Sequence, residues 1–105
     1  MRLYLSGPIT GVNDFRERFK KAEKALRADG ITDIVNPAEL IGVLSPESTS
    51  WDEYMRIDLE LLSMSDVLIL LLLPGWQQSL GCQREYGFAQ ASDKIIMEFG
   101  DMIKH

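Results

Sequence analysis

The most hydrophobic stretch of the chain is VLILLLL, residues 67–73, which contains no polar position. Because apolar and polar residues do not alternate along it, this stretch predicts a central strand covered on both faces of a sheet. Three shorter β-type runs predict further strands at residues 2–6, 31–35 and 94–98. The turn-forming pairs Gly7-Pro8 and Asn36-Pro37 close the first two of these runs.

Apolar residues that recur every three or four positions predict helices between the strands. The first helix has Asn13 as its candidate N-cap and Gly30 as its stop. Ser50 and Glu53 have the spacing of a capping box, which opens the second helix. The helices are expected at about residues 14–29, 51–63 and 79–92, with one further helical turn at 38–41.

This order of elements predicts an α/β fold, a flavodoxin-like or Rossmann-like open parallel sheet of four strands with helices on both faces. With 105 residues, the chain is expected to form one domain, residues 1–105. Ligands in such sheets bind at the carboxyl ends of the strands. We therefore expect any functional site among the segments that leave the strands at that edge: 7–11, 37 onward, and 74–81.

Composition narrows the classes of partner. A formal charge of −5 argues against a nucleic-acid polymer, because phosphate backbones are bound by basic surfaces. The seven-residue apolar run is too short to cross a membrane, and no signal peptide is visible at the N-terminus. One cysteine, Cys82, suits a reducing compartment, and one histidine, His105, leaves no histidine pair for a zinc or iron site. We expect a soluble, cytoplasmic protein without a metal or cofactor.

The first candidate for chemistry is SGPITG, residues 6–11, after the first strand. Its glycines and proline let the backbone pass close to a ligand, and free N–H groups there could meet hydroxyls or phosphate. The segment matches neither the dinucleotide-binding fingerprint nor the P-loop. A plain turn between strand and helix is the competing interpretation.

Asp58 lies on the apolar face of its helix, four residues after Tyr54 and four before Leu62. A carboxylate there needs a partner or a water-filled cleft. Either it serves a functional site, or it pairs with Arg56 or caps a neighbouring loop. The sequence leaves these two interpretations open.

Glu85 repeats this pattern on the last helix. It shares a helical stripe with Cys82 and Ala89, so it is expected to face the sheet near the ligand-binding edge. Gly81 and Gly87 flank it with minimal bulk, which makes sense if something approaches the helix closely. The alternative is a structural ion pair with Arg84 or a lysine.

Two inward carboxylates near one sheet edge fit acid–base or nucleophilic work, as in retaining glycoside chemistry. Ser79 stands where a helix start favours an anion, although it could equally be an ordinary N-cap. Three aromatic residues could line a base-stacking pocket or could belong to the core or a subunit interface: Trp51, Tyr54 and Trp76.

Three motifs carry a family resemblance across nearly the whole chain: YLSGPITG (4–11), IDLELLSMSDV (57–67) and SLGCQREYGFA (79–89). Together they resemble the nucleoside 2-deoxyribosyltransferase-like superfamily, which includes the 2′-deoxynucleoside 5′-phosphate N-hydrolases. The variant from Leu73 to Glu85 is most similar to a small branch that is often found in phage and prophage sequences.

The resemblance implies roles for individual residues. Glu85 matches the nucleophile that attacks C1′ of the sugar, and Asp58 matches the aspartate that assists departure of the base. The loop around the sugar and the nucleophile corresponds to Tyr4, Ser6, Gly7, Pro8, Ile9 and Gly11, with Gly81 on the facing helix. Ser79 matches a position at which the 5′-phosphate hydrolases carry serine, and this favours a nucleotide substrate.

The resemblance therefore implies hydrolysis of the N-glycosidic bond in a (deoxy)nucleoside 5′-monophosphate or a related nucleotide. The alternatives are a non-catalytic nucleotide-binding module and a nucleoside deoxyribosyltransferase. The resemblance also implies a homo-oligomer, a dimer or larger, and a fifth strand. For catalysis at neutral pH, Glu85 must be ionised and Asp58 partly protonated.

Overall fold

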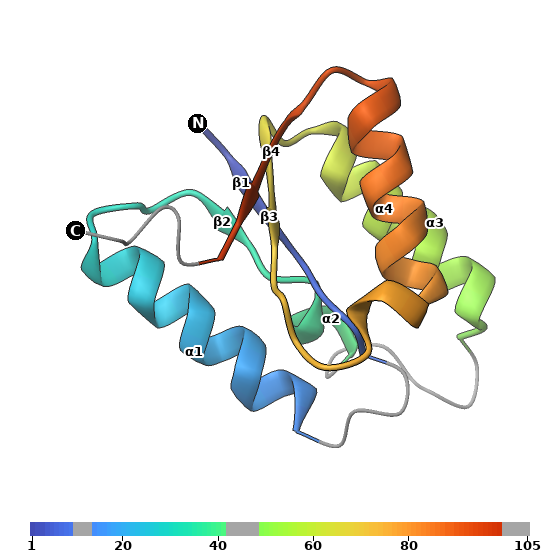
Figure 1. The fold of residues 1–105 in the computed structure, drawn as a ribbon, viewed down its shortest axis with the longest axis horizontal. Coiled ribbons are helices and arrows are strands. Elements are labelled where there is room, and N and C mark those ends of the chain that lie inside the picture. The colour runs from blue at the N-terminus through green and yellow to red at the C-terminus, as the bar shows by residue number, and fades with distance from the viewer. Residues whose placement is uncertain (10–13, 42–48, 100–105) are drawn as a thin grey trace.

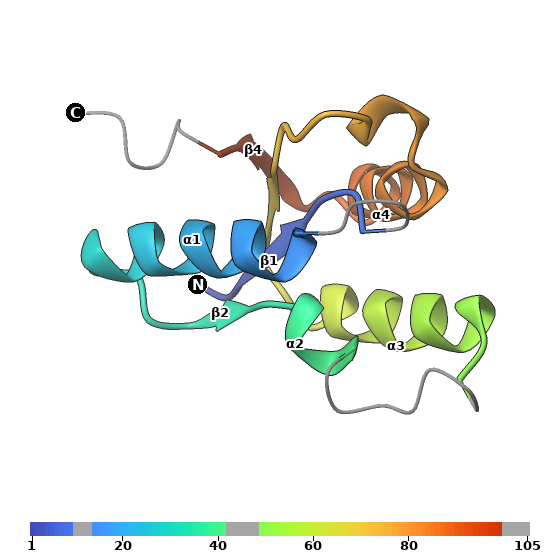
Figure 2. The same cartoon turned by 90° about the horizontal axis from the view of Figure 1, so that it is seen from below.

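The computed structural model describes residues 1–9, 14–41 and 49–99, and these form a four-stranded, all-parallel sheet with helices on both faces. This confirms the predicted α/β open sheet. The strands lie in the order β2-β1-β3-β4 (Figure 2). Their bounds are β1 Leu3–Ser6, β2 Ile34–Val35, β3 Val67–Leu70 and β4 Ile95–Glu98.

One long helix covers one face of the sheet and two cover the other. Figure 1 shows α1 on one side of the strands and the pair α3 and α4 on the opposite side. The helix bounds are α1 Phe15–Ala28, α2 Ala38–Ile41, α3 Trp51–Ser63 and α4 Leu80–Ala91, with a 3-10 turn, η1, at Trp76–Gln78. No helix among residues 1–9, 14–41 and 49–99 is long and apolar enough to span a membrane.

The apolar run of β3 is buried on both faces because the strand lies between β1 and β4. Val67 and Ile69 belong to the core under α1, together with Phe19. Leu68 and Leu70 belong to the second core, under α3 and α4. Alternate residues of one strand thus enter opposite cores, as the absence of polar positions predicts.

The strands are shorter than the sequence predicts, for local reasons. The amide of Ile31 donates to the carbonyl of Leu26 (3.1 Å), so the first residues of the predicted 31–35 strand close helix α1 instead. After β3, the amide of Leu73 turns back to the carbonyl of Leu71 (2.8 Å), and Leu72 is 45% exposed. The described residues contain four strands, and a fifth strand is not among them.

The helix predictions hold with small changes. The N-cap of α1 is Asp14, not Asn13, which lies outside the described residues. The hydroxyl of Ser50 accepts a hydrogen bond from the amide of Glu53 (3.2 Å), which confirms the capping box of α3. The buried face of α3 is turned by about one residue, because Met55 rather than Tyr54 is fully buried.

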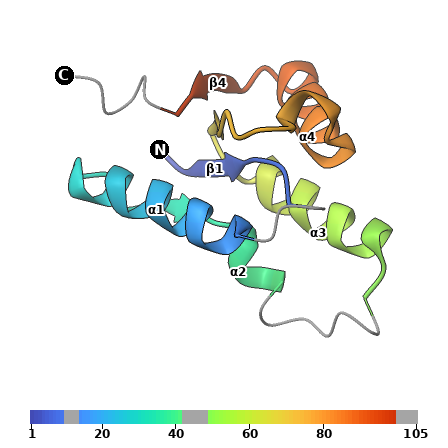
Figure 3. The ribbon, with the colours of Figure 1, turned by 60° about the horizontal axis from the view of Figure 1, so that its bottom comes forward.

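The strand order reverses at β1. The chain runs from β1 outward to β2 and then returns to place β3 on the other side of β1. Such a switch point leaves a crevice at the carboxyl ends of the two strands, here after Ser6 and Leu70. Figure 3 shows β1 pointing toward the side of the molecule that holds α3 and α4, and the candidate site lies there.

Candidate active site

Glu85 is buried in the second turn of α4, and its carboxylate faces the end of β1. Only 5% of the residue is exposed. The phenol of Tyr4 donates a hydrogen bond to one carboxylate oxygen, and the hydroxyl of Ser6 donates to the other (2.8 Å). Glu85 therefore faces inward as predicted, and its partners are two hydroxyl groups rather than Arg84 or a lysine.

The surroundings of Glu85 favour its protonated form. Burial is the largest effect and raises the pKa of Glu85 to about 8, with a further increase from the charge of Asp58. The hydrogen bonds from Tyr4 and Ser6 act in the opposite direction, because they stabilise the carboxylate. A pKa of about 8 means that protonated Glu85 is the more abundant form at pH 7.

Tyr4 and Ser6 act behind Glu85 rather than on the wall of the site. Both are completely buried on β1. Burial and the neighbouring charges of Glu85 and Asp58 raise the pKa of Tyr4 well above its ordinary value, so its phenol remains a donor. Both hydroxyl groups contact the carboxylate, and neither residue is among the described residues that line the cavity.

Asp58 is half-buried on α3, and burial raises its pKa to about 7. Arg56 is exposed, and no ion pair joins it to Asp58 within the part of the chain that the structure describes. The charge of Asp58 contributes to the raised pKa of Glu85. This geometry favours the interpretation of Asp58 as part of a site.

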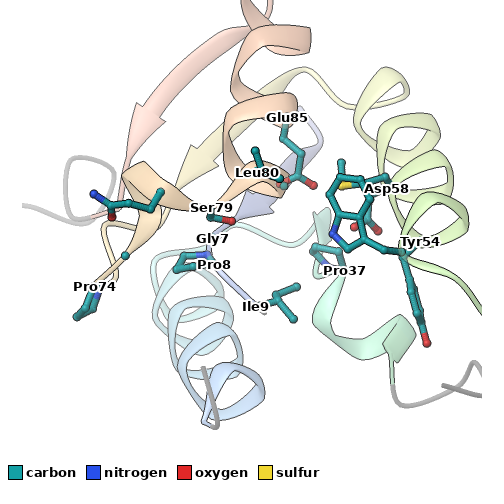
Figure 4. A pocket seen from close by; sticks show the side chains of 15 residues that line it. Gly7, Pro8, Ile9, Pro37, Tyr54, Asp58, Pro74, Ser79, Leu80 and Glu85 are labelled. Carbon is teal, nitrogen blue, oxygen red and sulfur yellow. The ribbon is translucent and has the colours of Figure 1, made fainter. Parts of the chain in front are cut away.

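Glu85 and Asp58 line one cavity of about 870 Å³, within the range of small-molecule sites. In Figure 4 the two carboxylates, on α4 and α3, turn into the space between the helices, beside the loop that follows β1. That loop contributes Gly7, Pro8 and Ile9 to the wall. Gly11, predicted to belong to the same loop, lies outside the described residues.

A family model described as "Domain of unknown function (DUF4406)" matches residues 1–98. The chain belongs to the DUF4406 family. No curated protein matches the chain. Because the family description states no activity, the function of this DUF4406 domain has to be argued from the cavity and its side chains.

Ser79 is the N-cap of α4, which is one of the two interpretations that the sequence left open. Its hydroxyl accepts a hydrogen bond from the amide of Cys82 (3.3 Å), which makes it the N-cap of α4. It also lines the cavity, as Gly81 does. Gly87 differs from Gly81, because a Cβ added at Gly87 would meet nothing within 4 Å. A Cβ at Gly81 would lie 3.6 Å from the sulfur of Met55, which is an ordinary contact, so neither glycine is required by a close approach of another part of the protein.

The charged groups on the wall of this DUF4406 cavity are all acidic. Among the described lining residues, Asp58 and Glu85 carry ionisable carboxyl groups, and no lysine or arginine is present. Within the described part of the chain, no group of three or more histidine, cysteine or acidic side chains is placed to hold a metal ion.

Two of the three aromatic residues considered for a base-stacking pocket line the cavity, and the third does not. Trp51 and Tyr54 lie on the cavity wall, whereas Trp76 packs against the core below α3 and α4. In Figure 4 the ring of Tyr54 extends away from Glu85, and its hydroxyl points away from the other side chains that line the cavity. Met55 and Leu80 also line the cavity and were missed, because apolar side chains carry no signal of function in a sequence.

Proposed function

We propose that this domain cleaves the N-glycosidic bond of a nucleoside or of its 5′-monophosphate, with Glu85 as the nucleophile. One observation carries this proposal: a buried carboxylate, held by two hydroxyl donors, shares a small-molecule cavity with a second carboxyl group. Paired carboxyl groups of this kind support displacement at an anomeric carbon. The resemblance of the motifs around Glu85 and Asp58 supports the same reaction.

In the first step, ionised Glu85 attacks C1′ and forms a C1′–O bond while the C1′–N bond breaks. The bonding electron pair leaves with the base, and protonated Asp58 supplies a proton to the departing nitrogen. With a pKa of about 7, Asp58 is about half protonated at neutral pH, which suits an acid in this step.

In the second step, water attacks C1′ and displaces Glu85, and ionised Asp58 accepts the proton that the water loses. The products are the free base and the free sugar or sugar phosphate. Tyr4 and Ser6 stabilise the Glu85 carboxylate before the attack and again when it leaves. If a second nucleobase rather than water attacked C1′ of this intermediate, the product would be a new nucleoside, as in a transferase.

The proposal leaves two substrate classes to compare, nucleosides with and without a 5′-phosphate. Ser79 supports a 5′-monophosphate through the family resemblance and through its position at the start of α4. The acidic wall favours an uncharged nucleoside instead, because a phosphate dianion would gain no cationic partner from the described lining residues. Both substrates therefore belong in the test.

The test is release of free base from four 2′-deoxynucleosides and their 5′-monophosphates, measured by chromatography. Wild type is expected to release base, and Glu85→Gln is expected to be slower by at least ~10³-fold, because the nucleophile is lost. Glu60→Gln is the matched control, since Glu60 is exposed on α3. Equal rates for wild type and Glu85→Gln would overturn the mechanism.

A non-catalytic nucleotide-binding module is the second candidate, and the raised pKa of Glu85 favours it, because a protonated carboxyl group is not a nucleophile. Calorimetry separates the two functions. Micromolar binding of a nucleotide without release of base over hours would establish the binder and exclude the enzyme.

A further inference from the structure

Trp51 is a large apolar side chain that remains 39% exposed on the wall of the cavity. It is the first residue of α3. The guanidinium carbon of Arg84, on α4, lies 4.9 Å from the centre of its ring. This contact is a cation–π interaction, in which the positive group covers a face of the indole. Trp51 is therefore held between two helices while part of its ring stays open to the cavity.

The position of Trp51 relative to the carboxyl groups suits a ligand with a flat ring. Trp51, Met55 and Asp58 occupy positions i, i+4 and i+7 of α3 and all line the cavity, so they share one helix face. Seven residues of helix rise by about 10 Å, so the indole and the Asp58 carboxyl group lie about two turns apart along one wall of the cavity, with Met55 between them. Arg84 directly precedes Glu85, so the same turn of α4 carries the nucleophile and fixes the indole.

We propose that Trp51 is the platform on which the base of the substrate stacks and that Arg84 is a positioning residue for the indole. This inference rests on the proposed function and names a determinant of its substrate class: planar aromatic bases rather than sugars or sugar phosphates alone. Stacking accepts any base, because every base presents a π face. It also places the glycosidic nitrogen near Asp58, which must reach it with a proton.

Trp76 provides an internal control, because it packs against the core and does not line the cavity. The chain has two tryptophans. Trp76→Phe thus leaves Trp51 as the sole source of tryptophan fluorescence. Addition of Glu85→Gln prevents turnover, so that binding is measured apart from catalysis.

In the Trp76→Phe/Glu85→Gln protein, deoxyadenosine and thymidine are expected to quench Trp51 fluorescence saturably, and 2-deoxyribose is expected to leave it unchanged. In the Glu85→Gln background, Trp51→Leu is expected to weaken deoxyadenosine binding on the order of 10- to 100-fold by calorimetry. Trp51→Phe, which keeps a smaller ring, is expected to recover most of this loss.

Arg84→Met is expected to weaken binding less than Trp51→Leu does, because it removes only the support of the ring. The double variant Trp51→Leu/Arg84→Met is expected to bind no more weakly than Trp51→Leu, since Arg84 acts through the indole. Additive losses would overturn the positioning role of Arg84. Thermal unfolding of each variant checks that the fold is intact.

Equal affinities of the Glu85→Gln protein with and without Trp51→Leu would overturn the platform, and so would absence of nucleoside binding by folded protein. Failure of the platform can be distinguished from failure of the proposed function. If wild type releases no base but Trp51 still reports deoxyadenosine binding, the platform stands within a binding module. If base is released while Trp51→Leu is without effect, only the platform fails.

Discussion

At the residue scale, the burial of Glu85 opposes the ionised state that its proposed role requires. A carboxylate removed from water is costly, and the pKa of Glu85 is raised to about 8 even with its hydrogen bonds in place. Two hydroxyl donors compensate in part. Because the pKa of Glu85 stays raised, the proposed nucleophile must lose a proton at a pH at which the proposed acid, Asp58, should keep one.

The pH profile should therefore be bell-shaped, with kcat/KM largest between the two pKa values of about 7 and 8. Activity rises with pH as Glu85 ionises, and it falls as Asp58 loses its proton. Because the groups interact, these limbs belong to the pair as a whole. Tyr4→Phe removes a hydrogen bond that lowers the pKa of Glu85, so less of the protein carries ionised Glu85 with protonated Asp58; the maximum of kcat/KM should fall and the falling limb should move to higher pH. The measurement is base release from pH 5 to pH 10.

Two further variants check the assignment of the limbs. Tyr86→Phe is the control for Tyr4→Phe, since Tyr86 is half-buried on α4 without a hydrogen bond to Glu85. Asp58→Asn should remove the falling limb and leave a single rising ionisation, that of Glu85, at a pH below 8, because the charge of Asp58 raises the pKa of Glu85. An unchanged falling limb in Asp58→Asn would contradict the role of Asp58 as the acid.

At the scale of elements, the start of α4 connects stability with the site. Ser79→Ala removes the N-cap and should cost ~1 kcal/mol in the free energy of unfolding. If Ser79 also recognises phosphate, the ratio of kcat/KM for the 5′-monophosphate to that for the nucleoside should fall. Urea unfolding and the two rates measure these effects separately.

Ser50→Ala is the matched variant for this prediction. Ser50 caps α3 with the same side-chain contact, but it is exposed and does not line the cavity. Its loss should have a similar stability cost and leave the substrate ratio unchanged. A substrate ratio that stays constant in Ser79→Ala would refute phosphate recognition by Ser79.

Element types could be predicted because they depend on local patterns. The apolar run of β3 and the capping box of α3 are readable over a few residues, and both are confirmed. Element ends depend on partners that a local pattern does not reveal. Of the predicted 31–35 strand, only Ile34 and Val35 pair with β1 and form β2, because the amide of Ile31 is taken by the end of α1.

At the scale of the whole molecule, the site joins parts of the chain that are far apart. Periodicity predicted that Glu85 and Asp58 face inward, and both reach the cavity. The resemblance placed Tyr4 and Ser6 near Glu85, but no local pattern indicated that these residues, 81 and 79 positions before Glu85, would donate hydrogen bonds to its carboxylate. The contact of Arg84 with Trp51 is likewise a product of helix packing, because α3 and α4 meet only in the folded chain.

The central claim is that Glu85 forms a covalent bond to the sugar, and trapping that bond tests it most directly. A 2′-fluorinated arabinonucleoside slows hydrolysis of the intermediate, because the fluorine withdraws electrons from C1′. Intact-protein and peptide mass spectrometry should show the added mass of the fluorosugar without its base on the peptide that contains Glu85, and none in Glu85→Gln. Stoichiometric base release without such an adduct, or an adduct of the same mass on Glu85→Gln, would contradict the account.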